Sequence, residues 1–428
     1  MKTLLTLFIL AAQLVGAQTI ADKLISINEA KVNIKSAIDA QGVDTTGVAF
    51  TDYHLSIAEI EGGGGEVGGA DYERPADWLE LPEVLETDQK MVALFAVHEA
   101  PNNIVAFTVS GDYTVDWGDG TVVDYDAGSI ASHNYAYENL GAETWSDRGY
   151  RQAILTITPQ DGQDITSFEF SVYPSSPIPT HPVYNFLDVV LSFPQCDEFS
   201  FGYGLFGTTN EDNVLKLLDS FEMKSSFLGV TSYINLFRGA ALRRAVIKAN
   251  EAVTHMSSMF AYCPSLTSVS LSGTSNARMS TMFRGCSSLT SVSLSGTSNV
   301  TNMSSMFQDC RSLASVPLFD TSSVTNMHYM FRGCHSLVSV PLFDTSSVTD
   351  KDFIFMDCFS LKRIQMPITR TVSLLNASME YDALVETITS LVPGNYTLTI
   401  RNNPGAAAVM ADIANDTITV PTGWTISN

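Results

Sequence analysis

Apolar residues recur at a fixed spacing through the second half of the chain. A phenylalanine returns every 23 or 24 residues, and a cysteine, a leucine and a valine or isoleucine follow it at steps of three. Catalytic motifs normally occur once, so a motif with a fixed period indicates a structural unit. The predicted core positions are Phe260, Cys263, Leu266, Phe283, Cys286, Leu289, Phe307, Cys310, Leu313, Phe331, Cys334 and Leu337.

Each unit contains two predicted elements, as residues 300–318 illustrate. From Val300 to Cys310, apolar residues stand three, three, one and three positions apart, which predicts one face of a short helix. The stretch from Leu313 to Leu318 then alternates like a strand with an inward apolar side. Such a unit cannot bury its apolar face alone, whereas stacked copies share a continuous core. The pattern predicts an α/β solenoid over residues 251–368.

The repeat resembles the leucine-rich repeats of bacterial BspA-type surface proteins, whose consensus reads NVTNMSSMFxxCxSLTSVxL. Phe237 lies 23 residues before Phe260, so residues 176–250 are expected to form degenerate repeats or an N-terminal cap. Residues 369–428 are expected to form a last repeat and a closing cap, because the final unit would otherwise expose its core edge.

Short β-rich runs separated by Asn, Gly and Asp turns begin near Lys90 and predict a β-sandwich over residues 76–175. The stretch Asp116-Trp117-Gly118-Asp119-Gly120-Thr121, followed by His133 and Tyr135, resembles the W-x-F-G-D-G-T and H-x-Y elements of PKD domains, which are immunoglobulin-like modules of surface proteins. The glycines and Asp119 are expected to form a tight turn. A calcium site is the weaker alternative, with candidates Asp116, Asp119, Asp124 and Asp126.

The N-terminal residues divide into three short segments. Residues 1–17 read as a signal-like leader, residues 18–61 as a helical module and residues 62–75 as a glycine-rich linker. The helical module resembles an N-terminal segment of bacteriophage tail and fibre proteins, through Asn33-Ile34-Lys35 and Gly42-Val43-Asp44. The resemblance implies attachment to other virion proteins. The expected fold class is therefore multidomain: a short helical module, a β-sandwich and a leucine-rich-repeat solenoid.

Net charge, cysteine positions and missing motifs exclude several classes of function. The net charge of −23 argues against nucleic acid as a partner, because phosphate binding needs a basic face. Five of the six cysteines occupy one repeat position, which predicts a ladder of buried free thiols, with disulfides as the alternative. No cofactor is expected, and no catalytic motif such as HExxH or GxSxG occurs, so we expect no enzyme. His255, His328 and His335 are expected to be exposed polar residues.

The favoured interpretation is a bacteriophage virion protein, a tail fibre, tip or decoration component, whose solenoid attaches to a protein or glycan of the host surface. A secreted cell-surface adhesin built from the same modules is the alternative, and a glycan-degrading enzyme is a distant third. A homo-oligomer is left open. The expected binding face consists of outward strand positions and two flanking aromatic residues: Ser268, Ser270, Ser291, Ser293, Pro317, Phe319, Pro341 and Phe343.

Overall fold

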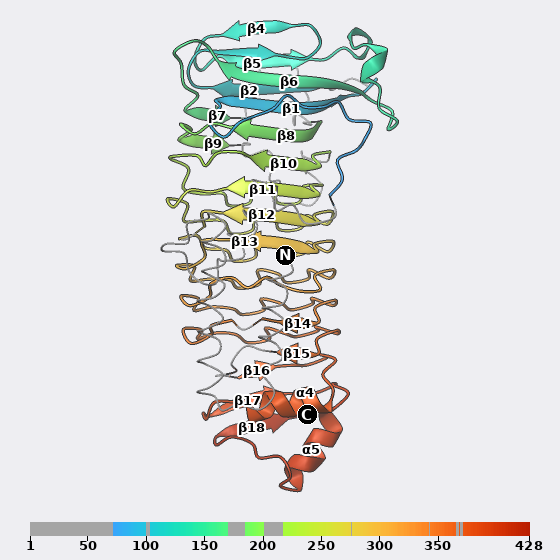
Figure 1. Ribbon diagram of the computed structural model, residues 1–428, viewed down its shortest axis with the longest axis vertical. Helices are drawn as coiled ribbons and strands as arrows, with labels where there is room; N and C mark the ends of the chain where they lie inside the picture. The colour runs from blue at the N-terminus through green and yellow to red at the C-terminus, as the bar shows by residue number, and fades with distance from the viewer. Residues whose placement is uncertain are drawn as a thin grey trace, which may run out of the picture. The chain divides into compact units, whose positions relative to one another are not determined.

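The computed structural model describes residues 72–99, 103–169, 185–200, 217–274, 276–341, 343–364, 368 and 371–428 (Figure 1). These residues belong to one compact unit, Gly68–Asn428. The predicted leader, the helical module and residues 62–71 of the linker lie outside the described residues. Within the described part of the chain, no helix has the length and apolar character that a membrane span requires.

Two sheets contain the N-terminal strands. Aromatic side chains from both sheets share one core, in which Phe95 packs on Tyr135 at 5.1 Å and Phe107 on Trp117 at 5.8 Å between ring centroids. The predicted strands are thus confirmed, while the relation to PKD domains stays a prediction. The strands of the first sheet are β1 (Lys90–Val97), β3 (Tyr113–Asp116), β4 (Val122–Tyr125) and β6 (Arg151–Pro159); those of the second are β2 (Ile104–Val109), β5 (Ile130–Asn134), β7 (Ser167–Glu169) and β9 (Glu198–Ser200). Two 3-10 helices, η3 (Tyr137–Asn139) and η4 (Ala142–Thr144), precede β6.

The first sheet continues directly into the repeats. Its order is β13-β12-β11-β10-β8-β1-β6-β3-β4, and β8 is the strand at which the direction changes, because it pairs antiparallel with β1 and parallel with β10. The predicted boundary near residue 175 therefore does not interrupt the sheet. The parallel strands are β8 (Phe186–Ser192), β10 (Ser220–Met223), β11 (Arg244–Lys248), β12 (Ser268–Ser272) and β13 (Ser291–Leu294).

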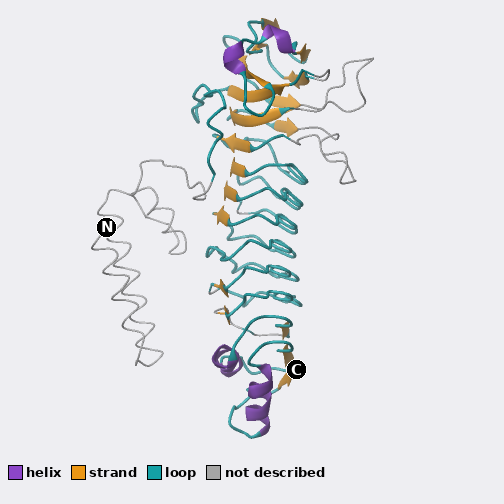
Figure 2. Ribbon diagram, turned by 90° about the vertical axis from the view of Figure 1, so that its right-hand side faces the viewer, coloured by secondary structure: helices purple, strands orange, loops and turns teal. Residues whose placement is uncertain are grey.

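The predicted repeat helices are wrong: this part of each unit is a run of turns (Figure 2). In the Phe307 unit, the N–H groups of Ser305, Phe307 and Asp309 donate to carbonyls of the next unit at 2.8–2.9 Å, whereas those of the residues between them donate three positions back. Ser305 and Asp309 adopt left-handed φ angles of 54° and 61°. A segment this short nucleates a helix poorly. The neighbouring unit supplies backbone acceptors, so turns replace the helix.

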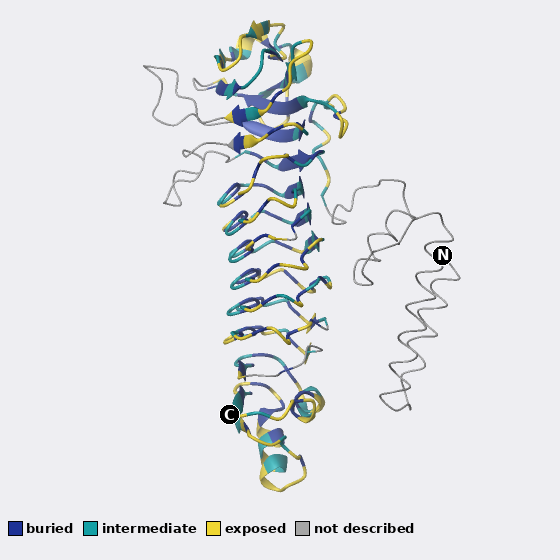
Figure 3. Ribbon diagram, turned by 90° about the vertical axis from the view of Figure 1, so that its left-hand side faces the viewer, coloured by how far each residue is buried: buried dark blue, intermediate teal, exposed yellow. Residues whose placement is uncertain are grey.

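The predicted core column is confirmed. All twelve named core residues are fully buried, and Figure 3 shows buried and exposed positions alternating along each coil. The rings from Phe237 to Phe355 stack with centroids 5.4–5.9 Å apart, which also confirms that Phe237 belongs to a degenerate repeat. The cysteines are free, as predicted, and each ladder thiol donates to the carbonyl of the preceding unit's phenylalanine, as Cys310 does to Phe283 at 3.0 Å.

Proline ends the long sheet. Ser291 and Ser295 donate their N–H groups to the preceding strand, and Pro317, the equivalent of the intervening Ser293, has no N–H to donate. Residues 313–320 accordingly form no strand. Pairing resumes only in the short strands β14 (Ser339–Val340) and β15 (Arg363–Ile364).

The C-terminal segment closes the stack with its own parallel sheet and two helices. The hydroxyl of Tyr381 in the first helix donates to Asp412 in the second at 2.6 Å, and Trp424 is buried at the end of the core. The elements are β16 (Val372–Ser373), β17 (Tyr396–Thr399), β18 (Trp424–Ser427), α4 (Tyr381–Thr389) and α5 (Ala406–Ala414). These elements cover the last unit of the stack, as expected of a cap formed by residues 369–428.

Candidate functional site

The predicted binding face on the strands is only partly exposed. Phe319 and Phe343 are 3% and 1% exposed and pack on each other at 4.8 Å, so their predicted exposure is wrong. The reason is the loss of strand geometry at Pro317, after which Leu318 turns outward, 40% exposed, and Phe319 takes the inward position. Ser268 is also buried, whereas the other predicted residues are half-buried: Ser270, Ser291, Ser293, Pro317 and Pro341. Binding through these five residues stays a prediction.

A segment before β1 covers the same face nearer the N-terminus. The guanidinium of Arg74 donates to Asp188 of β8 at 2.9 Å, and the hydroxyl of Tyr72 donates to Asp219 at 3.1 Å. Burial raises the pKa of Asp188, although Arg74 opposes that shift. Within the described residues, this part of the strand face is therefore occupied by the chain's own charged residues.

The turns form a second edge of the coils, opposite the strand face. The side chains on this edge differ between the early and the last units. In the early units, small hydroxyl residues form columns there: Ser257 meets Ser280 at 3.0 Å, and Ser258 meets Thr281 at 2.7 Å. In the last two units, these columns carry aromatic and charged side chains instead. We name His328, Tyr329, Asp350, Asp352 and Phe353 the turn-edge patch.

The aromatic half of the turn-edge patch forms a platform. Tyr329 and Phe353 stack with centroids 5.5 Å apart and planes at 27°, and the guanidinium of Arg332 lies 5.2 Å from the Tyr329 ring. Phe353 is 40% exposed. Both aromatic residues adopt left-handed φ angles, 57° and 54°, as Ser258, Thr281 and Ser305 do at the same position of earlier units, so this backbone geometry belongs to the repeat.

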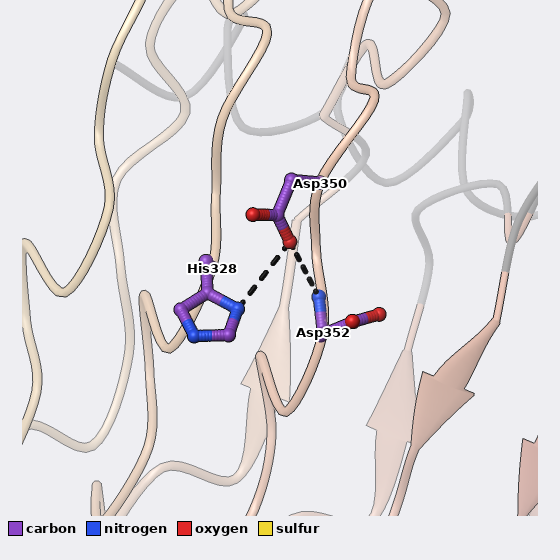
Figure 4. Close-up of side chains that lie close together, drawn as sticks. All are labelled: His328, Asp350 and Asp352. Carbon is purple, nitrogen blue, oxygen red and sulfur yellow. Dashed lines mark hydrogen bonds and ion pairs between the residues drawn. The ribbon is translucent and has the colours of Figure 1, made fainter.

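The charged half of the turn-edge patch brings three side chains together (Figure 4). Nδ1 of His328 lies 3.3 Å from Oδ1 of Asp350, and one ligand atom from each of His328, Asp350 and Asp352 lies within 4.8 Å of the others. The side-chain oxygen of Asn326 accepts the backbone N–H of His328 at 2.9 Å, and that of Asp350 accepts the N–H of Asp352 at 3.3 Å. Among the described residues, this is the group that could hold a metal ion.

Sequence reasoning missed this group, because its members belong to different units. His328 and Asp352 are separated by one repeat length, 24 residues, and Asp350 stands beside Asn326 through a backbone bridge. The signal lay in aligning the units: where His328 stands, the preceding unit has Ser304 and the following one Asp352.

Two of the four calcium candidates in the N-terminal region hold a turn. Asp116 and Asp119 each accept the N–H of the residue two positions later, at 2.9 and 3.0 Å, as the predicted turn requires. Asp119 also lies 2.7 Å from Nε2 of His133, and Asp124 accepts a threonine hydroxyl. Burial by itself would raise the pKa of Asp119, but these hydrogen bonds hold it below its usual value. With Asp126, the four form no metal-binding group among the described residues.

Comparison with known proteins bears on the repeats. A family model described as "Mycoplasma protein of unknown function, DUF285" matches residues 222–313 and 277–380. The matched residues lie in the stacked, parallel-paired units of the solenoid. The crystal structure of a leucine-rich repeat protein of T. pallidum is 21% identical to the chain, covering 40% of this chain and 82% of its own, with a TM-score of 0.29. No curated protein sequence matches the chain.

Proposed function

We propose that the chain is a non-enzymatic attachment protein whose solenoid contacts a protein or glycan on a host surface through its turn edge. The observation that carries the proposal is the aromatic platform of half-buried Tyr329 and exposed Phe353, which stands in a column that holds Asn235, Ser258, Thr281 and Ser305 in the earlier units. Solenoids present extended binding surfaces, and the residues on one edge vary without disturbing the core.

A second aromatic site on the turns supports the same edge. Tyr262 is 40% exposed and lies between the guanidinium groups of Arg238 and Arg284, at 5.5 and 5.7 Å from its ring. Tyrosine and arginine are enriched in protein interfaces and often dominate their binding energy. The strand face offers mainly serines and prolines, so it is the weaker candidate.

The proposed setting is a bacteriophage virion, in which residues 18–61 would join the chain to other virion proteins. A secreted adhesin remains the second candidate, because residues 1–17 resemble an export signal. Peptide mass spectrometry of fractionated host cultures separates the two. A virion protein co-purifies with capsid proteins, whereas an adhesin occurs in the particle-free fraction and begins near Gln18.

The attachment face is tested with the full chain and a panel of bacterial envelopes and arrayed glycans. The double variant Tyr329→Ala/Phe353→Ala is expected to lose binding at least ten-fold, since aromatic anchors of this kind contribute about 2 kcal/mol or more to binding. The matched control, Thr281→Ala/Ser305→Ala, changes the same columns in the earlier units and should bind like the wild type. Equal binding by both variants would contradict the turn edge as the attachment face.

A further inference from the structure

We infer that His328, Asp350 and Asp352 bind one divalent transition-metal ion of the zinc type, which links two successive units of the solenoid. The three side chains come from neighbouring coils and offer one imidazole nitrogen and two carboxylates within 4.8 Å of one another. This inference does not depend on the attachment role proposed above.

The state of His328 favours a metal. Its Nδ1 is a buried atom without a hydrogen-bond partner, although it lies only 3.3 Å from a carboxylate oxygen of Asp350. A buried nitrogen without a partner destabilises the fold. A cation between Nδ1 and the carboxylate would satisfy both groups at once.

The distances suit a tetrahedral site. With metal–ligand bonds of about 2.0–2.2 Å, neighbouring ligand atoms lie roughly 3.3–3.6 Å apart. The separation of 3.3 Å between His328 and Asp350 already meets this requirement. Asp352 is exposed, so a rotation of its side chain brings its carboxylate into reach. Three protein ligands leave a fourth position for water or for an oxygen of a bound molecule.

The surroundings hold the first ligands in place. Asn326 accepts the backbone N–H of His328, and Asp350 accepts that of Asp352, the same turn contact that Asn302 makes with Ser304 in the preceding unit, so the repeat turns position these residues. Lys351 stands between the two aspartates in sequence, but it is 1% exposed and occupies the core column of Met327. The Lys351 side chain is therefore buried, not displayed at the surface.

The donor set selects the type of ion. An imidazole nitrogen suits Zn²⁺, Ni²⁺ and Co²⁺, whereas Ca²⁺ takes six to eight oxygen ligands and Mg²⁺ keeps most of its water. The preceding units cannot form an equivalent site, because they place Ser280 and Ser304 where His328 stands. We therefore expect one ion per chain.

The test uses the full chain, stripped with a chelator and titrated with Zn²⁺ in a calorimeter, with Co²⁺ absorption as a second readout. The wild type is expected to bind one equivalent, and Co²⁺ should show tetrahedral absorption bands. His328→Ala and Asp352→Asn should each weaken binding at least ten-fold. His335→Ala, which removes another half-buried histidine of the same unit, should leave it unchanged.

Circular dichroism confirms that each variant is folded, and Asp352→Asn, a change at an exposed position, keeps the test valid if His328→Ala does not fold. The inference is overturned if the wild type binds no Zn²⁺, or if one equivalent still binds with unchanged affinity in Asp352→Asn and in a folded His328→Ala.

Discussion

The N-terminal sheets and the repeats bury apolar side chains in two different ways. In the N-terminal region, each buried residue meets different partners: Trp117 packs on Phe107 and on His133, and its carbonyl accepts the hydroxyl of Tyr135. In the repeats, each buried residue packs on its own equivalents, as Phe307 does on Phe283 and Phe331.

The sequence separation of these contacts also differs. Strand β1 pairs with β6 about sixty residues away, as in Met91 with Ile157, whereas the repeat strands pair with partners 23 or 24 residues away. Contacts between near neighbours make stability approximately a sum over units. A destabilising substitution in the repeats should therefore affect mainly the units next to it. A destabilising substitution in the N-terminal sheets should affect all of their strands.

The largest expected difference between the two regions is their stability at alkaline pH, because all six cysteines lie outside residues 72–169. Burial raises the pKa of the Cys263 and Cys358 thiols from 9.0 to about 12 and that of the other ladder thiols well above 9.0. A group whose pKa is raised by folding stabilises the fold fully below its unfolded pKa. That contribution is lost as the pH rises from about 9 toward 12, by about 1.4 kcal/mol per pH unit for each thiol.

Hydrogen exchange between pH 8 and 11 should therefore show the repeats opening before the N-terminal sheets. The buried Tyr113 and Tyr135 of those sheets also have raised pKa values, but they start from 10.0 and respond later. A thiol reagent at pH 8 should leave the ladder unmodified until the chain unfolds. Simultaneous opening of both regions, or rapid labelling of the native chain, would contradict the role given to the buried thiols.

The second effect concerns a single core residue. Phe307→Ala should lower the free energy of unfolding of the repeats by about 3–5 kcal/mol, because it leaves a cavity between two stacked rings. Thermal unfolding followed by calorimetry should then resolve two transitions, with the N-terminal sheets melting near the wild-type temperature. Phe359→Ala, at a side chain that is 48% exposed, should change stability by less than about 0.5 kcal/mol. One transition shifted as a whole would show that the regions are coupled.

The sequence predicted the repeat core well and its backbone poorly. A spacing of three residues fits a helix face, but it also fits turns in which every second N–H reaches the next unit, as at Phe307. Only the presence of the neighbouring coil decides between the two. The inward position of Phe319 depends on a proline two residues earlier, which no periodic pattern reveals.

The metal-binding group of the turn-edge patch was missed for a related reason. Outward serines were identified from the alternation in β12 and β13, but the meeting of His328 with Asp350 requires the units to be stacked in register. The continuity of the sheet through β8 was also missed, because the strands from residue 176 to 250 lack the clear repeat motif.

The smallest expected effect concerns the end of the long sheet. Pro317→Ser restores an N–H donor where Ser293 has one, which should add about 0.5–1.5 kcal/mol through the hydrogen bond. Loss of proline's rigidity in the unfolded chain offsets about 0.4–1 kcal/mol of that gain. Infrared spectra should show more parallel sheet and urea unfolding a slightly later midpoint. The mirror variant, Ser293→Pro, should shorten the sheet and lower the midpoint; a gain in that variant would contradict the role given to proline.

The parallel ladder between units also governs how the chain can change in length over evolution. Because each coil presents the same backbone groups to the next, removing or duplicating a stretch such as residues 300–323 leaves both neighbouring coils with the contacts they need. Each such event would move the C-terminal cap by about one strand spacing, roughly 4.8 Å. Successive units share most of their residues, as 300–323 and 324–347 do, so relatives of this chain should differ in reach by whole coils.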